Sequence, residues 1–230
     1  MIPFLIYILV KKYRKSGKAG YRPGVRNFTG VCYRFLLISL VIILIALIPF
    51  LSKSQSQRLN YKIVKGSDEI GWLKLDKNIS GNKLTLELTS EIKTRMIFLF
   101  KVCSKETSSF ENGKLIQSTQ FRKTNGEVKL NKQTRLAADK YEVIENGEKQ
   151  KLSITYIGLN LLSLYFQEPT ATLFYCDKHE CFISITRTND GGYKVIFPDD
   201  NSNVFYYSGG ICTRVKIEHT FYTVNIILKP

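Results

Sequence analysis

The strongest constraint on the fold is an alternation of apolar and polar side chains with a period of two residues. In the segment LTLELTSEI (84–92), leucines occupy one parity and threonines or glutamates the other. Successive side chains of a β-strand point to opposite faces, so this pattern predicts a strand with one buried and one solvated face. Similar patterns predict strands at 61–65, 71–75, 128–136, 151–157, 182–188, 193–197, 204–208, 213–219 and 222–228.

Turn signals separate these predicted strands. Asn-Gly pairs occupy 112–113, 125–126 and 146–147. Asparagine tolerates a positive φ and glycine adopts it freely, as a type I′ hairpin turn requires. Short strands and tight turns predict an all-β fold, an antiparallel β-barrel or barrel-like sandwich, over residues 57–230. Within it, the apolar run at 96–102 predicts either a buried section or a bend.

One segment departs from the alternation. In GLNLLSLYFQEP (158–169), Leu159, Leu162 and Phe166 are spaced by three and four residues, which predicts a short helix. Pro169 prevents its continuation. Such a helix covers the open end of many barrels, so we expect a structural lid, with a gating lid over a ligand pocket as the alternative.

The N-terminal residues differ in composition from the rest of the chain. Residues 1–56 hold nine basic residues and no acidic one, whereas the other 174 hold 25 basic and 19 acidic residues. The uncharged run 35–51 predicts a hydrophobic helix near the minimum length for crossing a bilayer, and the preceding basic residues favour a cytoplasmic N-terminus. Ser54 and Ser56 have the spacing that a signal peptidase reads. The segment 35–56 therefore predicts a cleaved export signal or an uncleaved membrane anchor.

Either reading places residues 57–230 in the periplasm or cell envelope. Residues 1–34 form a basic extension that is longer than an export signal normally has. One hypothesis is that translation begins near Arg34 and that residues 1–30 are not translated.

The order of several segments supports a family resemblance. The segments are YKIVKGSDEIGWLKL, FENGKLIQSTQFRKTNGE, YEVIENGE, LYFQEP and YKVIFPDDNSNVFYYSGGI. In this order they resemble a family of uncharacterised exported proteins that is common in Bacteroidetes and belongs to the domain-of-unknown-function class. The resemblance spans about residues 59–228. It implies a β-barrel-like fold without an established activity.

Four cysteines lie in the predicted exported part. In CDKHEC, the four residues between Cys176 and Cys181 predict a hairpin loop that sets these cysteines opposite each other. Facing Cα atoms lie ~4.5–5.5 Å apart, within the disulfide range, and a disulfide there would contribute about 2 kcal/mol. Cys103 and Cys212 are candidates for a second disulfide, and free thiols are the alternative. We expect no metal, although Cys176, His179 and Cys181 offer a three-ligand alternative.

Tyr193, Tyr206 and His219 are candidates for the lining of a ligand pocket. The two tyrosines lie on predicted neighbouring strands, and His219 shares the parity of Val215 and Ile217, which predicts an inward side chain. An aromatic lining favours a lipid or other apolar ligand. A filled core, with a hydrogen-bonded buried histidine, is the alternative.

The sequence contains no motif of a nucleophile elbow, phosphate-binding loop, dinucleotide site or zinc protease. Its basic residues are scattered, which argues against nucleic acid as a partner. We therefore expect a non-catalytic envelope protein without a cofactor, which binds a lipid or apolar molecule or serves structurally, and which contacts a membrane through 35–51 if that run is uncleaved. One alternative is an envelope hydrolase with converging carboxylates at the barrel mouth. Another is a protein-binding module with an exposed edge strand.

Overall fold

The computed structural model describes residues 54–95, 99–220 and 222–230. These residues belong to one compact unit, Ser52–Pro230. The predicted extension 1–34 and the apolar run 35–51 lie outside the described residues. Within the described ranges, no helix has both the length and the apolar character needed to cross a membrane.

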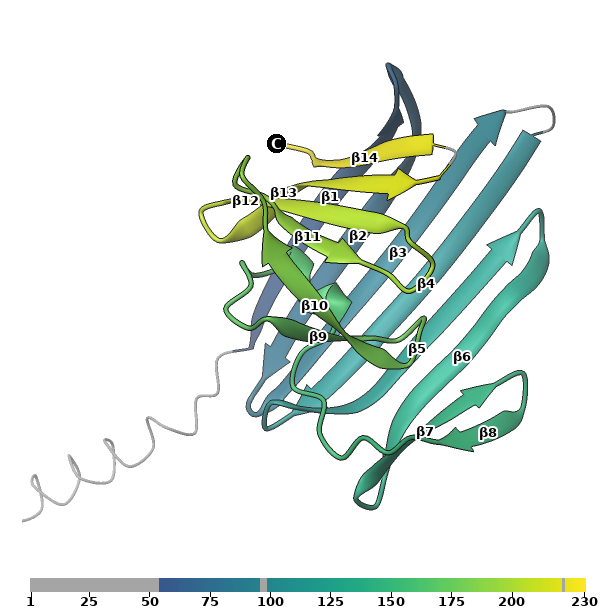
Figure 1. Cartoon of the computed structure of the whole chain (residues 1–230). Coiled ribbons are helices and arrows are strands. Elements are labelled where there is room, and N and C mark those ends of the chain that lie inside the picture. The colour runs from purple at the N-terminus through teal and green to yellow at the C-terminus, as the bar shows by residue number, and fades with distance from the viewer. Residues whose placement is uncertain (1–53, 96–98, 221) are drawn as a thin grey trace, which may run out of the picture. The chain divides into compact units, whose positions relative to one another are not determined.

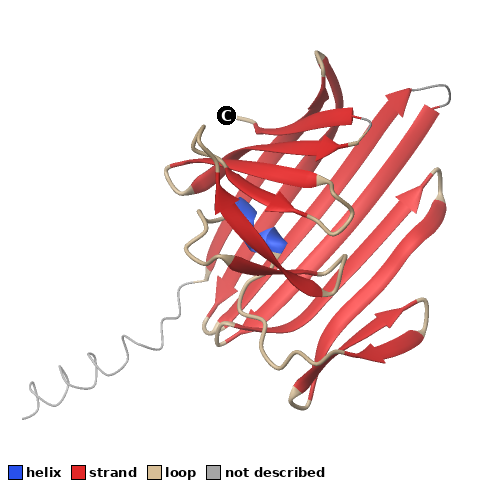
Figure 2. Ribbon diagram, viewed as in Figure 1, coloured by secondary structure: helices blue, strands red, loops and turns tan. Residues whose placement is uncertain are grey.

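Fourteen strands in the described residues form one antiparallel sheet (Figures 1 and 2). They are β1 (Gln55–Lys65), β2 (Asp68–Ser80), β3 (Lys83–Arg95), β4 (Leu99–Glu111), β5 (Lys114–Thr124), β6 (Glu127–Ala137), β7 (Lys140–Glu145), β8 (Glu148–Lys151), β9 (Leu173–Cys176), β10 (Cys181–Arg187), β11 (Tyr193–Ile196), β12 (Ser202–Ser208), β13 (Ile211–His219) and β14 (Tyr222–Leu228). A 3₁₀-helix, η2, spans Leu161–Tyr165. The predicted all-β, antiparallel fold is confirmed.

The sheet folds into two layers. Its strand order is β8-β7-β6-β5-β4-β3-β2-β1-β14-β13-β12-β11-β10-β9, so the first and last of the described strands are neighbours and β8 and β9 are the edges. The long strands β1–β6 form the larger layer, and the shorter strands β9–β13 lie in front of it (Figure 1). We call these the large layer and the front layer.

The hairpin turns form where the sequence predicts them. Asn112, Asn125 and Asn146 have φ values of 51°, 50° and 52°, and the glycine after each also has a positive φ. Both central residues of a type I′ turn need this left-handed conformation. The Asn-Gly pairs therefore set the register of β4–β5, β5–β6 and β7–β8 locally.

The strand prediction at 151–157 is wrong. β8 ends at Lys151, and residues 152–159 follow an irregular path. Their backbone instead bonds to other parts of the sheet: the Leu115 amide donates to the Ile157 carbonyl (2.8 Å), and the Tyr141 amide donates to the Ile154 carbonyl (3.2 Å). Apolar and polar residues alternate here because one side of this irregular segment packs against the core, as the buried Leu152 and Ile157 show.

The predicted short helix is present as η2, but it does not cover a barrel end. Its residues Leu162, Leu164 and Tyr165 are buried, and η2 contacts β3 in the large layer and β9 and β13 in the front layer. Tyr165 packs edge-on against Tyr61 of β1 and Phe205 of β12, with 5.8 Å between ring centroids in each pair. The helix therefore forms part of the core between the two layers.

Part of the apolar run 96–102 lies outside the described residues, and the rest begins β4. Phe100 is 39% exposed, so the described portion of this run is not a buried section of strand.

Candidate functional site

The inner face of the large layer changes from apolar to polar across the sheet. Directly paired residues of antiparallel strands point to the same face, so the register gives continuous rows of side chains. One row, from β1 to β6, consists of Leu59, Leu75, Leu88, Glu106, Gln120 and Lys132. The neighbouring row consists of Tyr61, Leu73, Ser90, Ser104, Arg122 and Leu130. In these two rows the leucines of β1–β3 and Tyr61 form the apolar part, and all of the charged side chains lie on β4–β6.

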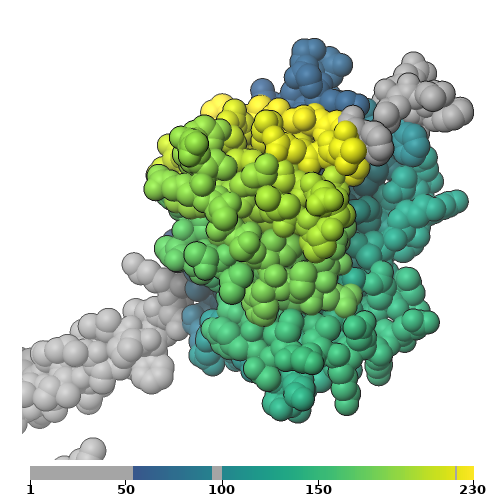
Figure 3. Space-filling model, in the orientation of Figure 1, coloured from purple at the N-terminus to yellow at the C-terminus, as the bar shows by residue number. Residues whose placement is uncertain are grey.

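Part of this inner face stays accessible. Leu86 and Leu88 are 1% and 8% exposed, whereas inward-facing residues farther along β3–β6 are partly buried or exposed. The front layer covers only part of the large layer, and β4–β6 extend beyond it (Figures 1 and 3). We call the accessible residues the open inner face: Ser90, Ile92, Val102, Ser104, Arg122 and Leu130. They combine apolar, hydroxyl and cationic groups.

The loop between β9 and β10, residues 177–180, packs against the polar part of the inner face. The Asp177 carboxylate accepts hydrogen bonds from the Ser118 hydroxyl and, at 3.2 Å, from the Asn160 amide. The same Asn160 nitrogen donates to the Ser108 hydroxyl at 2.7 Å. We call this group the closure cluster: Ser108, Ser118, Lys132, Asn160, Asp177 and Glu180. It joins β4–β6 to the β9–β10 hairpin.

Lys132 supplies the cation of the closure cluster. Its side chain is 7% exposed, and its ammonium group lies 2.7 Å from a Glu180 oxygen and 2.9 Å from a Glu145 oxygen. Burial alone would lower the pKa of Lys132, but the hydrogen bonds to the two glutamates outweigh it and raise the pKa. The lysine is therefore charged at neutral pH, and both carboxylates compensate its burial.

Glu106 lies where the closure cluster meets the open inner face. Burial and the nearby charge of Asp177 raise the pKa of Glu106, while the Gln120 hydrogen bond and the Arg122 charge act in the opposite direction. Burial also raises the pKa of Asp177, against the hydrogen bonds from Ser118 and Asn160. Within the described part of the chain, the Gln120 Oε1 atom is buried without a hydrogen-bond partner. The site thus holds an acid with a raised pKa beside a buried acceptor that has no hydrogen-bond partner.

Sequence spacing did not single out Glu106 and Asp177. They come from β4 and from the β9–β10 loop, so only the folded chain brings them together. One signal was available, because Glu106 shares the parity of Ser108 and Phe110, which are buried. The sequence does not show this parity to be the buried one, because several inward residues of β4 are polar, as its outward residues are.

The structure confirms the hairpin geometry around Cys176 and Cys181, which are direct cross-strand partners. All four cysteines of the described residues are free thiols in the structure. The Cys103 thiol on β4 donates to Glu91 at 3.7 Å and the Cys212 thiol on β13 donates to the Arg214 carbonyl at 3.5 Å, so the two thiols have different partners. A disulfide between Cys176 and Cys181 stays a prediction.

The three-ligand metal alternative is not supported. His179 stacks on Phe197, with ring centroids 5.9 Å apart, and its Nε2 atom lies 3.9 Å from Asp199. Among the residues that the structure describes, no three His, Cys, Asp or Glu side chains lie close enough together to hold a metal ion.

The three predicted pocket residues have separate contacts. The Tyr193 hydroxyl donates to Glu168 at 2.6 Å, and the Tyr206 hydroxyl donates to Asp190 at 2.8 Å. His219 stacks on Tyr222 with ring centroids 4.7 Å apart. The three residues therefore pack on separate neighbours, and a shared role in lining a ligand pocket stays a prediction.

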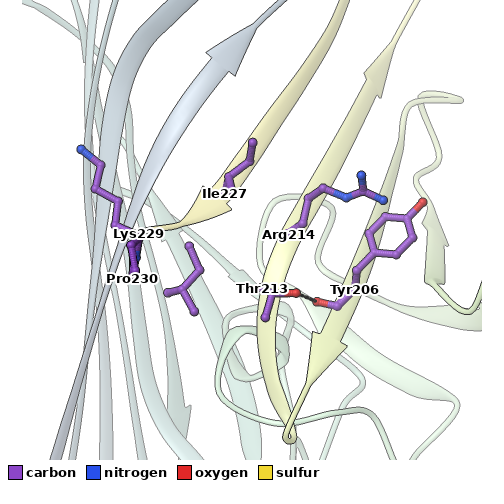
Figure 4. Close-up of a pocket in the computed structure, with 7 residues that line it drawn as sticks. Tyr206, Thr213, Arg214, Ile227, Lys229 and Pro230 are labelled. Atoms are coloured by element: carbon purple, nitrogen blue, oxygen red, sulfur yellow. Dashed lines mark hydrogen bonds between the residues drawn. The ribbon is translucent and has the colours of Figure 1, made fainter.

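Tyr206 lines a groove between β12, β13 and the end of β14 (Figure 4). Its volume is about 540 Å³. The Arg214 guanidinium lies over the Tyr206 ring, 3.9 Å from its centroid, and Ile227 and Leu228 supply apolar surface. The groove forms because Leu228 pairs with Tyr61 of β1, so the end of β14 leaves β13.

These two antiparallel layers define the protein as an all-β, barrel-like domain. A family model described as Domain of unknown function (DUF6134) matches residues 61–229, and the chain belongs to this family. A solved β-barrel-like protein of the domain of unknown function DUF1849 from Brucella abortus has a similar fold, with a TM-score of 0.51 and 10% identity. The match covers 75% of this chain and 94% of that chain. At this identity the likeness concerns the fold alone.

No curated protein matches the chain. The predicted resemblance is confirmed in its general form, a domain of unknown function with a barrel-like fold. Export from the cytoplasm and occurrence in Bacteroidetes stay predictions.

Proposed function

We propose that this protein is a non-catalytic binding protein of the cell envelope, and that the open inner face binds a lipid or another amphipathic small molecule. The observation that supports this most is the accessibility of inward-facing side chains on β3–β6, beside a fully packed core. A barrel-like fold that served only as a structural element would gain by burying Ile92, Val102 and Leu130. Their partial exposure leaves apolar surface for a ligand.

The polar boundary of the open inner face suits the head group of such a ligand. Gln120 Oε1 is an acceptor that a hydroxyl or amine donor of the head group would satisfy. Arg122, which is exposed, adds a cation on the neighbouring row. A ligand with a hydrocarbon part and a donor-bearing head would therefore match both regions of the face.

The test uses a dansyl-labelled alkylamine as the probe and the full chain in mild detergent. Ser104→Trp places a large side chain in the open inner face, and Lys105→Trp places the same side chain on the opposite face of β4 as a matched control. We expect Ser104→Trp to weaken probe binding about tenfold or more and Lys105→Trp to leave it unchanged. Circular dichroism confirms that both variants fold.

Equal binding by both tryptophan variants and the unmodified chain would refute the proposed site. Mass spectrometry of molecules extracted from the purified full chain then shows the natural ligand class. An amphipathic molecule recovered from the unmodified chain and the Lys105→Trp variant, but not from the Ser104→Trp variant, is the expected result.

Hydrolysis is the second candidate function, because Glu106 and Asp177 lie close enough for the charge of Asp177 to raise the pKa of Glu106. An acid with a raised pKa is suited to general acid catalysis. Asp177 is less suited to a chemical role, since both of its oxygens accept hydrogen bonds within the closure cluster. Turnover of chromogenic esters or glycosides that disappears in Glu106→Gln would favour the hydrolase.

The structure gives little support to a partner that adds a strand at a sheet edge. β8 is an exposed edge, but it is only four residues long and its sequence is EKQK. Short edges rich in lysine are typical of strands protected from edge pairing. At the other edge, the Tyr175 amide of β9 already donates to the Leu159 carbonyl at 3.0 Å.

A further inference from the structure

The β9–β10 hairpin holds two thiols at its end. Cys176 and Cys181 are the last directly paired residues before the loop, and the Glu180 amide donates to the Cys176 carbonyl at 2.8 Å. Glu180 has a φ of 59°, so the loop turns tightly through a left-handed residue. Paired residues of antiparallel strands have Cα separations that overlap the range of disulfides.

We propose that Cys176 and Cys181 form a reversible disulfide that fixes the loop 177–180 in the closure cluster. The inference is independent of ligand binding, because its observations concern the hairpin and its contacts alone.

Every residue of the loop has a contact outside the hairpin. Asp177 accepts hydrogen bonds from Ser118 and Asn160, and Glu180 pairs with Lys132. The Lys178 ammonium lies 2.7 Å from Asp199, and His179 stacks on Phe197 in the front layer. A covalent link at the base of the loop therefore restricts the residues that join the two layers.

The environments of the two thiols determine which of them reacts first with an external disulfide. Cys181 is partly exposed, whereas Cys176 is buried, and burial raises the pKa of the Cys176 thiol to about 11. We therefore expect the Cys181 sulfur, as the thiolate, to attack an external disulfide such as oxidised glutathione first. A mixed disulfide forms and one glutathione thiolate leaves.

The Cys176 thiol then loses its proton and attacks the Cys181 sulfur, and the second glutathione leaves as a thiolate. Overall, two protein thiols lose two protons and two electrons, and glutathione disulfide is reduced to two thiols. The other two cysteines of the described residues have contacts of their own. The Cys103 thiol donates to Glu91 at 3.7 Å, and the Cys212 thiol, which is buried, donates to the Arg214 carbonyl at 3.5 Å.

Peptide mapping tests the bond directly. The full chain in mild detergent is treated with excess oxidised glutathione, alkylated under denaturing conditions and cut with trypsin without reduction. Cleavage after Lys178 separates the two cysteines onto peptides 152–178 and 179–187. We expect these two peptides to remain linked, and the link to persist in Cys103→Ser. Separately alkylated peptides, or a link from Cys181 to another cysteine, would overturn the proposal.

Hydrogen exchange tests the consequence of the bond. We expect amides 177–180 to exchange about tenfold more slowly in the oxidised than in the reduced chain, and no such difference in Cys181→Ser. An unchanged exchange rate in a chain that carries the bond would refute the fixation of the loop. Cys181→Ser is chosen because Cys181 is only partly buried, so the variant keeps the core intact.

Discussion

At the residue scale, the closure cluster and its boundary are governed by how each charge is compensated. Lys132 has two carboxylate partners, and Asp177 accepts two hydrogen bonds. Glu106 has weaker compensation, because Gln120 donates one hydrogen bond and Arg122 is exposed. Burial therefore disfavours its ionised form, as the raised pKa of Glu106 indicates.

We predict that Glu106→Gln stabilises the folded chain at neutral pH by on the order of 1 kcal/mol. The pKa of Glu106 is higher in the folded chain than in the unfolded chain, so folding favours the protonated form. The unmodified chain thus loses stability as the pH rises from the ordinary glutamate pKa of 4.5 to the raised value. Thermal unfolding of both proteins at pH 4 and pH 7 checks this.

The expected gain in the melting temperature of Glu106→Gln appears at pH 7 and is small at pH 4, where both side chains are neutral. Glu87→Gln is the control. Glu87 on β3 is a partly exposed carboxylate that pairs with Lys105 on β4, and we expect no such gain from its substitution. A pH-independent effect of Glu106→Gln would show that the charge is not the cause.

At the element scale, one glycine allows β2 and β3 to approach each other closely. A Cβ atom built on Gly71 would lie 2.2 Å from the Glu91 carbonyl oxygen and 2.9 Å from the Ile92 Cα atom. Gly71 also pairs with Ile63, immediately before the register shift between Ile63 and Val64. The bulge and the missing side chain together let the strands bend at this point.

We predict that Gly71→Ala destabilises the protein by about 2 kcal/mol, because backbone atoms must move to accept the new methyl group. Gly66→Asn is the matched control. Position 66 has a φ of 61° and nothing within 4 Å of a new Cβ atom, and asparagine tolerates this conformation. Chemical denaturation should show a lower midpoint for Gly71→Ala alone. Equal midpoints for the two variants would contradict a steric role for Gly71.

At the scale of the whole molecule, the two edges of the sheet are joined by side-chain contacts and by an irregular segment, and not by direct pairing of β8 with β9. β8 and β9 are the two sheet edges, and the closure cluster connects strands near them through Lys132, Glu180 and Asp177. The irregular segment 152–159 adds backbone hydrogen bonds to Leu115, Tyr141 and Tyr175. This mode of closure leaves the inner face of β4–β6 partly uncovered, which the proposed binding function requires.

We predict that Lys132→Met destabilises the protein by about 3 kcal/mol, because Glu180 and Glu145 lose their shared cation. Lys129→Met, at an exposed pair with Glu127 on the same strand, should change stability by less than about 1 kcal/mol. The raised pKa of Lys132 means that its contribution is fully present below the ordinary lysine value of 10.5 and is lost as the pH rises through the folded value. Denaturation at pH 7 compares the variants, and similar losses for both would refute this role.

Much of the fold was predictable from the sequence, but the candidate site was not. Alternation located most strands, and the three Asn-Gly pairs located their turns. The same alternation misled at 151–157, because burial on one side of an irregular segment produces the same pattern as a strand. The pairing of Cys176 with Cys181 was predictable, since a four-residue loop makes it local.

The sequence by itself determined the antiparallel strands and hairpins of this protein, because the two-residue period and the left-handed turn act between near neighbours. Only the tertiary structure decided that the β9–β10 loop packs against β4–β6, that Glu106 lies near Asp177, and that part of the inner face stays open. Those features depend on how the two layers meet, and contacts between residues so far apart in the chain leave no periodic signal.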